Sequence, residues 1–251
     1  MQALIVERTA KKEYLDHNLI SRRTKKNTAI HTVFWQAQIA PGYLLLQMLT
    51  FLGILKGIDQ WDRQLFSRIN QDWINPFFDA IMPFVRTSNH WMPLYLFLFV
   101  FVLINFKGKG AWWFLFFLST IAITDLTGTQ LFKHNIERLR PCRDPEMLSH
   151  LRLLINSCSG GNSFISNHAA NHFGMASFFF FTFRKVLPRW AWLGFAWAGL
   201  IAYSQVYIGV HYPSDVLSGA LVGLLAGRLT SALFNKRFGF TIFDNQSIAA
   251  S

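Results

Sequence analysis

Long apolar runs are the feature of this sequence that most restricts its fold. Six stretches are long enough, as helices, to cross the roughly 30 Å of hydrocarbon in a bilayer. They lie at about residues 38–57, 90–106, 111–131, 168–184, 189–208 and 213–234. Hydrophobic residues make up 52% of the chain, including 26 Phe and 9 Trp, which is more apolar mass than a soluble domain of this length usually buries. The sequence therefore predicts an all-α, polytopic membrane protein built as a six-transmembrane-helix bundle.

The basic residues gather before the first span, between the second and third, between the fourth and fifth, and after the sixth. With six crossings, these four segments fall on one side of the membrane, which the positive-inside rule assigns to the cytoplasm. Segments 58–89, 132–167 and 209–213 then lie on the other side. This topology explains the net charge of +11. We expect an integral membrane protein with cytoplasmic termini, which in a bacterium would lie in the plasma or inner membrane. Its expected partner is the lipid bilayer, and no nucleic-acid partner is expected.

The chain is expected to form one domain with two tails. Residues 1–33 are charged and polar, with no apolar signal segment, and are predicted to be a basic cytoplasmic tail. Residues 34–238 hold the six spans, and 239–251 form a C-terminal tail. Within 58–89, large apolar residues recur at every fourth position: Trp61, Leu65, Ile69, Trp73, Phe77 and Ile81. This spacing predicts either an interfacial amphipathic helix, single or double, or an ordinary helix packed on the bundle.

Both cysteines, Cys142 and Cys158, lie in one predicted external segment. A disulfide persists on a non-cytoplasmic face, and this one would close the loop that joins two polar motifs. The alternative is a pair of free, buried thiols. The shared loop favours the disulfide.

Three groups of polar residues are predicted to meet at the same non-cytoplasmic face. They are Lys133 and Arg140 in KHNIERLRP; Ser163, Ser166, Asn167, His168 and His172 in GGNSFISNHAANH; and Ser204, Gln205, His211 and Asp215 in SQVYIGVHYPSD. A six-span bundle needs none of these side chains for packing. Their convergence therefore predicts a polar pocket.

This set of side chains suits phosphoryl transfer. Lysine and arginine bind phosphate, and the N–H groups at the start of a helix near His168 add an anion site. His211 can act as a nucleophile if Asp215, one helical turn later, fixes its tautomer and stabilises its cation. His168 can then protonate the leaving alkoxide. The chemistry passes through a phosphohistidine and uses no metal or cofactor.

The order and spacing of the three motifs resemble those of the type 2 phosphatidic acid phosphatase superfamily. That superfamily includes membrane lipid phosphatases, bacterial acid phosphatases and vanadium haloperoxidases, and its pattern is KxxxxxxRP, then PSGH, then SRxxxxxHxxxD. The matching positions are Lys133, Arg140, Pro141, Ser166, His168, Ser204, His211 and Asp215. Together with the six-span layout, the resemblance covers nearly the whole chain after residue 34.

The resemblance implies a role for each matching side chain. His211 would be the nucleophile, Asp215 its orienting partner and His168 the general acid. The implied phosphate-binding set is Lys133, Arg140, Ser166, Asn167 and Gln205. The implied activity is that of a membrane phosphatase acting on a lipid phosphate or diphosphate of the phosphatidic acid, phosphatidylglycerol phosphate, polyprenyl diphosphate or lipid A type. A site at headgroup level would suit such a substrate.

Three positions depart from the pattern: Ile165 stands for Pro, Asn167 for Gly and Gln205 for Arg. Asparagine tolerates positive φ, so Asn167 is expected to preserve a turn that presents its N–H. Gln205 offers neutral donors, whereas charge-assisted hydrogen bonds are roughly twice as strong. Loop residues that could supply the missing charge are Arg138, Arg143 and Arg152. The alternatives are a slow enzyme, an altered substrate preference or a non-catalytic relative.

Two functions of other classes stay open. Gln205 is compatible with a transport or phospholipid-binding protein that keeps the pocket without turnover. His168 and His172 have the spacing of a helical zinc pair, which would suit an intramembrane metalloprotease, but the sequence lacks the Glu of HExxH. Asp125 is a separate case, because a carboxylate within a span is costly. We expect it either to pair with Arg228 or to lie near the site.

Overall fold

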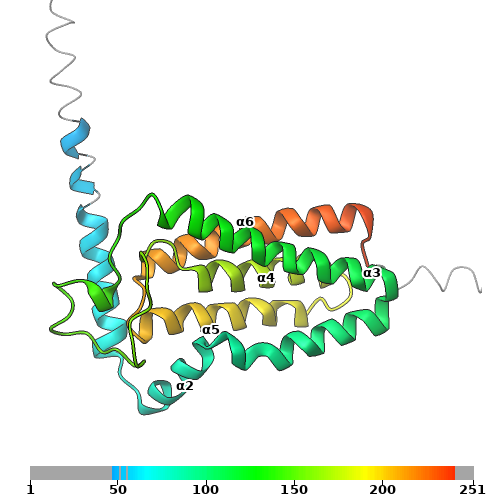
Figure 1. The fold of residues 1–251 in the computed structure, drawn as a ribbon, viewed down its shortest axis with the longest axis horizontal. Coiled ribbons are helices and arrows are strands. Elements are labelled where there is room, and N and C mark those ends of the chain that lie inside the picture. The colour runs from blue at the N-terminus through cyan, green and yellow to red at the C-terminus, as the bar shows by residue number, and fades with distance from the viewer. Residues whose placement is uncertain (1–46, 51, 55, 241–251) are drawn as a thin grey trace, which may run out of the picture. The chain divides into compact units, whose positions relative to one another are not determined.

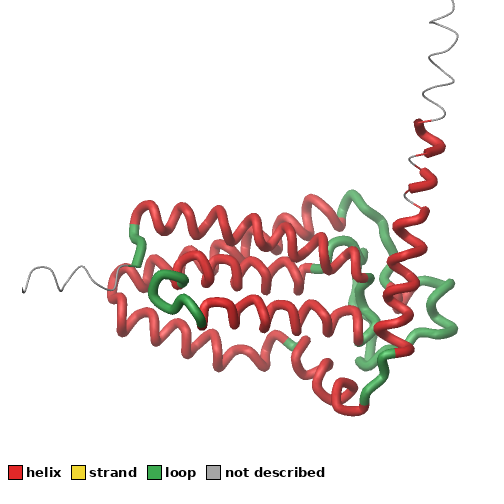
Figure 2. The backbone as a smooth tube through the Cα atoms, turned by 180° about the vertical axis from the view of Figure 1, so that it is seen from behind, coloured by secondary structure: helices red, strands yellow, loops and turns green. Residues whose placement is uncertain are grey.

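The computed structural model describes residues 47–50, 52–54 and 56–240. The chain divides into two units, Met1–Asp59 and Gln60–Ser251, and all elements discussed below belong to the second. Every regular element in the described residues is helical, which confirms the predicted all-α class (Figures 1 and 2). Most of the predicted first span, the predicted N-terminal tail and all of the predicted C-terminal tail beyond Phe240 lie outside the described residues, and the count of six spans stays a prediction.

The second unit begins with helical residues 60–67. The elements that follow are η1 (Arg68–Asp72), α2 (Pro76–Arg86), η2 (Ser88–Trp91), α3 (Met92–Leu126), η3 (Thr127–Lys133), η4 (Pro141–Arg143), α4 (Asn167–Phe183), η5 (Trp190–Trp192), α5 (Leu193–Tyr207) and α6 (Pro213–Arg237). Two described stretches are long and apolar enough to cross a membrane, Ser88–Lys133 and Pro213–Arg237.

The long helix α3 consists of two helices joined by a reversal of the chain. At Lys107 the backbone leaves the helical region, with φ 49° and ψ −125°, and Figure 1 shows the ribbon turning back along the bundle. Gly110 permits this turn, because a Cβ there would lie 2.3 Å from the carbonyl oxygen of Val102. The reversal coincides with the predicted basic connection between the second and third spans.

Helix α2 packs on the end of α5. The Tyr207 hydroxyl donates a hydrogen bond to Asp79 (2.7 Å), and the Tyr207 ring meets Phe78 edge-on. Met82 and Val85 are buried, whereas Phe77 and Phe84 are more than half exposed. The segment is thus packed on the bundle and also presents the aromatic outer face expected of an interfacial helix.

Helices α4 and α6 approach each other closely because α6 carries glycine at every fourth position of the contact. A Cβ at Gly223 would lie 2.2 Å from the carbonyl oxygen of Ala170, and one at Gly227 would lie 2.3 Å from that of Gly174. Small residues at this spacing let helix backbones touch, as in membrane helix pairs. This contact sets the starts of α4 and α6 side by side.

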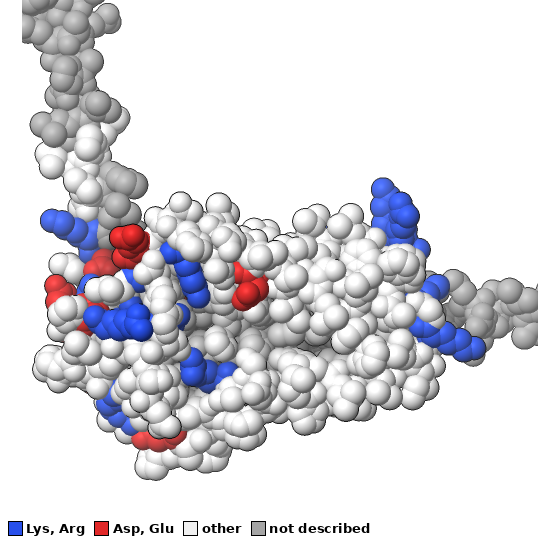
Figure 3. All heavy atoms as spheres, viewed as in Figure 1, with Lys and Arg blue, Asp and Glu red and all other residues white. Residues whose placement is uncertain are grey.

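The starts of these helices meet the loop 134–166 at one end of the bundle (Figure 2). A disulfide between Cys142 and Cys158 closes part of this loop, with the two Cα atoms 5.8 Å apart. Figure 3 shows charged side chains gathered toward the two ends of the bundle, with acidic residues visible only toward the loop end. The opposite, basic end is the one that the sequence predicts to be cytoplasmic.

Replacing Gly223 with Ala is expected to force α4 and α6 apart, because the new methyl group would meet backbone atoms that cannot rotate away. Overpacking of this kind costs about 1–3 kcal/mol. Gly199→Ala on α5 is the matched control, since a Cβ there meets nothing within 4 Å. Thermal unfolding of the purified protein in detergent should show a lower Tm for the first variant only. Equal Tm values for the two variants would contradict the close contact.

Candidate active site

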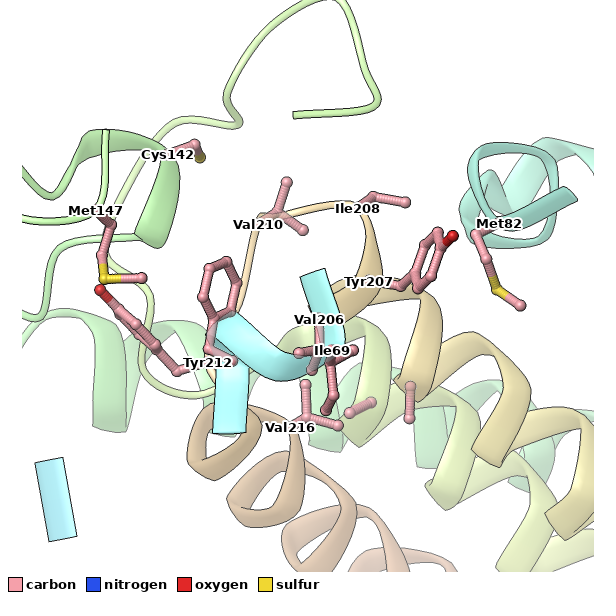
Figure 4. Packing of buried hydrophobic residues seen from close by; sticks show 13 residues of the cluster. Ile69, Met82, Cys142, Met147, Val206, Tyr207, Ile208, Val210, Tyr212 and Val216 are labelled. Atoms are coloured by element: carbon pink, nitrogen blue, oxygen red, sulfur yellow. The ribbon is translucent and has the colours of Figure 1, made fainter. Parts of the chain in front are cut away.

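His211 lies in a turn between α5 and α6 that buried apolar side chains hold in place. Figure 4 shows these neighbours, and the fully or almost fully buried ones on the turn are Tyr207, Ile208, Val210 and Tyr212. Gly209 has a φ of 91°, and a Cβ there would also lie 2.8 Å from the carbonyl oxygen of Arg152. The turn therefore requires glycine two residues before His211. His211 itself is 2% exposed.

The two ring nitrogens of His211 face different partners. Arg140 Nη1 lies 2.8 Å from Nε2, while Nδ1 lies 3.5 Å from Asp215 Oδ2 and 3.4 Å from Ser163 Oγ. A guanidinium only donates, so Nε2 accepts and the ring proton resides on Nδ1, toward the carboxylate. Burial lowers the pKa of His211 to about 4, although the bond to Asp215 acts in the opposite direction. His211 is thus a neutral imidazole whose Nε2 carries a lone pair.

The carboxylate of Asp215 is fixed by three further donors. These are Ser163 Oγ at 2.5 Å, the backbone N–H of Tyr212 at 3.0 Å and Arg138 Nη1 at 2.8 Å. Asp215 stands in the first turn of α6, two residues after Pro213, where it caps the helix. Every contact restrains the carboxylate beside the imidazole.

Asp62, from helical residues 60–67, extends this network. Its carboxylate accepts from Arg138 Nη2 at 2.6 Å and from the backbone N–H of Ser214 at 2.8 Å, and it is fully buried. The Arg138 guanidinium also lies 4.2 Å from the centre of the Tyr212 ring. Sequence reasoning missed Asp62, because it follows Trp61 in a segment where polar residues are expected to face solvent.

Arg140 and Lys133, the cations of the first motif, lie close enough to interact electrostatically. Arg140 is buried, and it donates to the carbonyl oxygens of Gly161 and Val210, both at 3.3 Å. Burial lowers the pKa of Arg140 to about 10, so it remains a cation at neutral pH. Lys133 ends η3, and its carbonyl oxygen accepts from Asn162. The first motif thus brings two positive charges to the His211 turn.

The second motif starts α4. Ser166 is the N-cap, and its buried Oγ accepts from the backbone N–H of Ala169 at 3.4 Å. The predicted positive φ at Asn167 is wrong, since Asn167 is the first helical residue and Lys107 is the only described non-glycine residue with positive φ. The N–H group of Asn167 is therefore presented by a helix start, which needs no left-handed turn.

The Asn167 side chain instead anchors α4 to α3 and η3. Its amide donates to Asp125 Oδ1 at 2.8 Å and to Thr129 Oγ1 at 3.0 Å. Gly128 leaves room for it, because a Cβ there would lie 2.5 Å from Asn167 Oδ1. This contact assigns Asp125 its partner. The predicted alternative of an Asp125 pair with Arg228 is wrong, because the Arg228 guanidinium lies over the Phe181 ring.

His168 lies in the first turn of α4 and interacts electrostatically with His211, Arg140 and Arg86. His172, one turn later, directs Nδ1 to the carbonyl oxygen of His168 at 2.7 Å and Nε2 toward the Tyr95 hydroxyl at 3.5 Å. No group of three metal-ligating side chains occurs among the residues that the structure describes. The geometry therefore lends no support to the zinc-protease alternative.

Gln205 is fully buried on α5 and poorly satisfied. Its amide nitrogen makes two long contacts, to the Ile201 carbonyl oxygen at 3.4 Å and to Ser204 Oγ at 3.5 Å, and its Oε1 has no partner. The Ser204 hydroxyl back-bonds to Ile201 at 2.6 Å, as an ordinary helical serine does. This end of α5 offers the site only neutral groups.

Two of the three arginines considered as replacements for the missing charge are bound to carboxylates. Arg138 pairs with Asp215 and Asp62, and Arg152 pairs with Asp79 at 2.7 Å. The third, Arg143, is exposed. If a guanidinium replaces the one that Gln205 lacks, it therefore has to come from another residue of the fold.

An apolar cavity of about 310 Å³ lies within the bundle, between α3, α4 and α5. Its lining includes Leu94, Tyr95, Met175, Phe179 and Trp197. The indole of Trp197 meets the His172 ring edge-on, with centroids 4.9 Å apart. The cavity therefore reaches the helical turn that follows His168.

Known proteins resemble this chain in sequence and in fold. The PAP2 superfamily model matches residues 110–239, which contain all three motifs. The lipid A 4′-phosphatase of Bacteroides thetaiotaomicron is 33% identical over 158 residues, which cover 62% of this chain and 69% of that protein. The lipid A 4′-phosphatase of Porphyromonas gingivalis is 29% identical over 119 residues, covering 47% of this chain and 49% of that protein, so the chain spans about half the length of this second relative.

A solved structure shares the fold. The crystal structure of a transmembrane PAP2-type phosphatidylglycerolphosphate phosphatase from Bacillus subtilis superposes with a TM-score of 0.59 at 22% identity. The superposition covers 74% of this chain and 90% of that chain.

Asp62→Asn is expected to destabilise the protein, because it removes the charge that pairs with Arg138 and turns an amide donor toward the guanidinium. Breaking a buried ion pair costs on the order of 3 kcal/mol. Asp72→Asn, at an exposed position in the same segment of the chain, is the matched control and should change stability by no more than about 0.5 kcal/mol. Thermal unfolding in detergent measures both, and an unchanged Tm for Asp62→Asn would refute the network.

Proposed function

The chain belongs to the PAP2 superfamily, and on that premise we propose that it is a membrane-embedded lipid phosphatase that works through a phosphohistidine formed on His211. The observation that carries the proposal is the placement of His211. Its Nε2 faces the cationic Arg140, and its Nδ1 faces the buried carboxylate of Asp215. This arrangement suits a nucleophile whose target is an anion.

The first half-reaction transfers the phosphoryl group to the protein. Arg140, Lys133 and the N–H groups at the start of α4 hold the phosphate, and His211 Nε2 attacks phosphorus. The P–O bond to the lipid breaks as the N–P bond forms, and Asp215 stabilises the positive charge that develops on the imidazole. His168 gives its proton to the leaving alkoxide.

The second half-reaction releases phosphate. A water molecule enters where the alcohol has left, gives a proton to His168 and attacks phosphorus, and the N–P bond breaks. His211 returns to its neutral form with the proton still on Nδ1. The acid of the first step thus serves as the base of the second, as microscopic reversibility requires.

In the substrate-free protein, Arg140 donates a hydrogen bond to His211 Nε2, so the lone pair that would attack phosphorus is already engaged. A phosphate oxygen is a stronger acceptor than a neutral imidazole, because both partners of the new bond are charged. An arriving phosphate is therefore expected to draw the guanidinium away from Nε2 and free it for attack. Substrate binding and activation of His211 are then the same event.

The apolar cavity beside His172 supports a lipid as substrate, since an acyl or prenyl chain could occupy it while the phosphate stays at the polar end. Candidate substrates are phosphatidic acid, phosphatidylglycerol phosphate, polyprenyl diphosphate and lipid A phosphates. The two curated relatives favour the lipid A type. The disulfide in the loop favours a site on the non-cytoplasmic face.

The neutral Gln205 keeps a second candidate open, a phospholipid-binding or transport protein that retains the pocket without turnover. Such a protein would bind lipid phosphate and release none. Turnover assays on the wild type separate it from the enzyme.

His211→Gln is expected to abolish phosphate release from a panel of lipid phosphates in detergent with EDTA present, because no other side chain replaces Nε2. Quenching wild type with SDS at alkaline pH, after reaction with a substrate radiolabelled in its phosphate, should trap label in an acid-labile, base-stable bond, and the variant should trap none. His150→Gln, an exposed position in the loop, is the control and should retain both properties. Turnover that survives in His211→Gln would exclude the phosphohistidine route.

The pKa of His211 can be tested directly. Because burial lowers it to about 4, the imidazole should stay neutral from about pH 8 down to about pH 5 and take up a proton only as the pH approaches 4. ¹⁵N-histidine NMR of the detergent-solubilised protein measures this, and the resonance missing from His211→Gln identifies the residue. A midpoint near the unperturbed value of about 6.5 would show that the ring is solvated and not held as described.

A further inference from the structure

We propose that Arg86, the last residue of α2, is the guanidinium that position 205 lacks, so that the phosphate attacked by His211 is held between Arg86 and Arg140. The inference rests on the proposed function, because it concerns the same phosphate. Arg86 lies outside all three sequence motifs.

Arg86 reaches the loop at Ser159 and is incompletely bonded. Its Nη2 donates to Ser159 Oγ at 2.9 Å, while its Nε is buried and has no hydrogen-bond partner. Burial lowers the pKa of Arg86, although the group remains a cation. A buried, unpaired N–H on a cation costs free energy unless an acceptor reaches it. This N–H is available to a ligand oxygen.

Arg86 and Arg140 converge on one short piece of the loop. Arg86 binds Ser159, and Arg140 Nε donates to the carbonyl oxygen of Gly161, two residues later. The Cys142–Cys158 disulfide joins the residue just before Ser159 to the segment that follows Arg140. Burial lowers the pKa of Arg140, and the charge of Arg86 acts in the same direction.

Neither of these two guanidiniums makes an ion pair with a carboxylate in the described part of the chain. The nearest candidates are taken: Asp79 binds Arg152 and Tyr207, and Asp215 binds Arg138 and Ser163. The charge of Asp215 partly offsets that of Arg140, but Arg86 and Arg140 still repel each other, and a dianionic phosphate is the ligand that relieves the repulsion. The structure thus has positive charge in excess at the place where the substrate is negative.

His168, the proposed general acid, marks the place where this excess charge lies. It interacts electrostatically with Arg86 and Arg140 as well as with His211. A phosphate in contact with both guanidiniums would therefore also lie near the nucleophile and the acid. The planar guanidinium of Arg86 can donate two charge-assisted hydrogen bonds to phosphate oxygens at once. The amide of Gln205 is neutral and can make only the weaker, uncharged kind.

The test uses the purified full-length protein in detergent, with Arg86→Ala and Arg86→Lys, and with Arg68→Ala as the exposed control from the same external segment. Arg86→Ala should lower kcat/KM on a lipid phosphate monoester about 10²- to 10³-fold, the usual loss for one transition-state donor. Calorimetric binding of inorganic phosphate should weaken about tenfold or more, as expected for a charge-assisted bond. Arg86→Lys should fall between, and Arg68→Ala should match wild type.

Two rescues separate phosphate binding from a merely structural role. Gln205→Arg should restore activity and phosphate affinity in the Arg86→Ala background while giving little gain in wild type, because the charge is then supplied twice. Added guanidinium ion should rescue Arg86→Ala and leave Arg68→Ala unchanged, and this readout remains if Gln205→Arg fails to fold. Failure of both rescues in a folded Arg86→Ala protein would overturn the assignment.

Other outcomes are equally decisive. Wild-type phosphate affinity and turnover in Arg86→Ala would overturn the inference. So would a loss confined to diphosphate substrates, which would place Arg86 at a second phosphate. If the wild type releases no phosphate from any lipid, yet binds inorganic phosphate in a manner that depends on Arg86, the inference stands and the proposed turnover fails.

Discussion

The buried carboxylate of Asp215 is the interaction on which the rest of the site depends. A carboxylate in an apolar bundle is costly unless it is paired and hydrogen-bonded. Its partners are Arg138 near the start of the loop 134–166, Ser163 near the end of that loop, and the turn that carries His211. Satisfying one charge therefore fixes three segments, and Arg138 passes the constraint on to Asp62.

The contacts within one turn of helix could be predicted from the sequence, whereas the distant ones could not. His211 lies two residues before α6 begins and Asp215 lies in the first turn of α6, so their short separation in sequence predicts that they are neighbours. The chain reversal near Lys107 follows from a short basic break between apolar runs. Asp62 and Arg86 escaped prediction, because each reaches the site through tertiary packing of a segment with no motif of its own.

Asn167 shows how a departure from a motif can be misjudged. Its side-chain chemistry predicted a left-handed turn, but the N-cap at Ser166 already presents the N–H groups of α4. The residue instead uses its amide to bind Asp125, which gives a partner to a carboxylate that would be costly within a span. Backbone propensity was the weaker influence, and hydrogen-bond acceptors on α3 and η3 hold the side chain.

The arginines near the site fall into two classes by their charge partners, and this division accounts for the neutral residue on α5. Arg138 and Arg152 pair with carboxylates and stabilise the fold, whereas Arg86 and Arg140 have none and leave the pocket positive. A third unpaired guanidinium at position 205 would add repulsion in the substrate-free state, where no anion offsets it. A guanidinium on α2 and a guanidinium on α5 are therefore alternative ways to supply the same positive charge to the phosphate. Once Arg86 supplies the charge, the repulsion between unpaired guanidiniums favours a neutral residue such as Gln205.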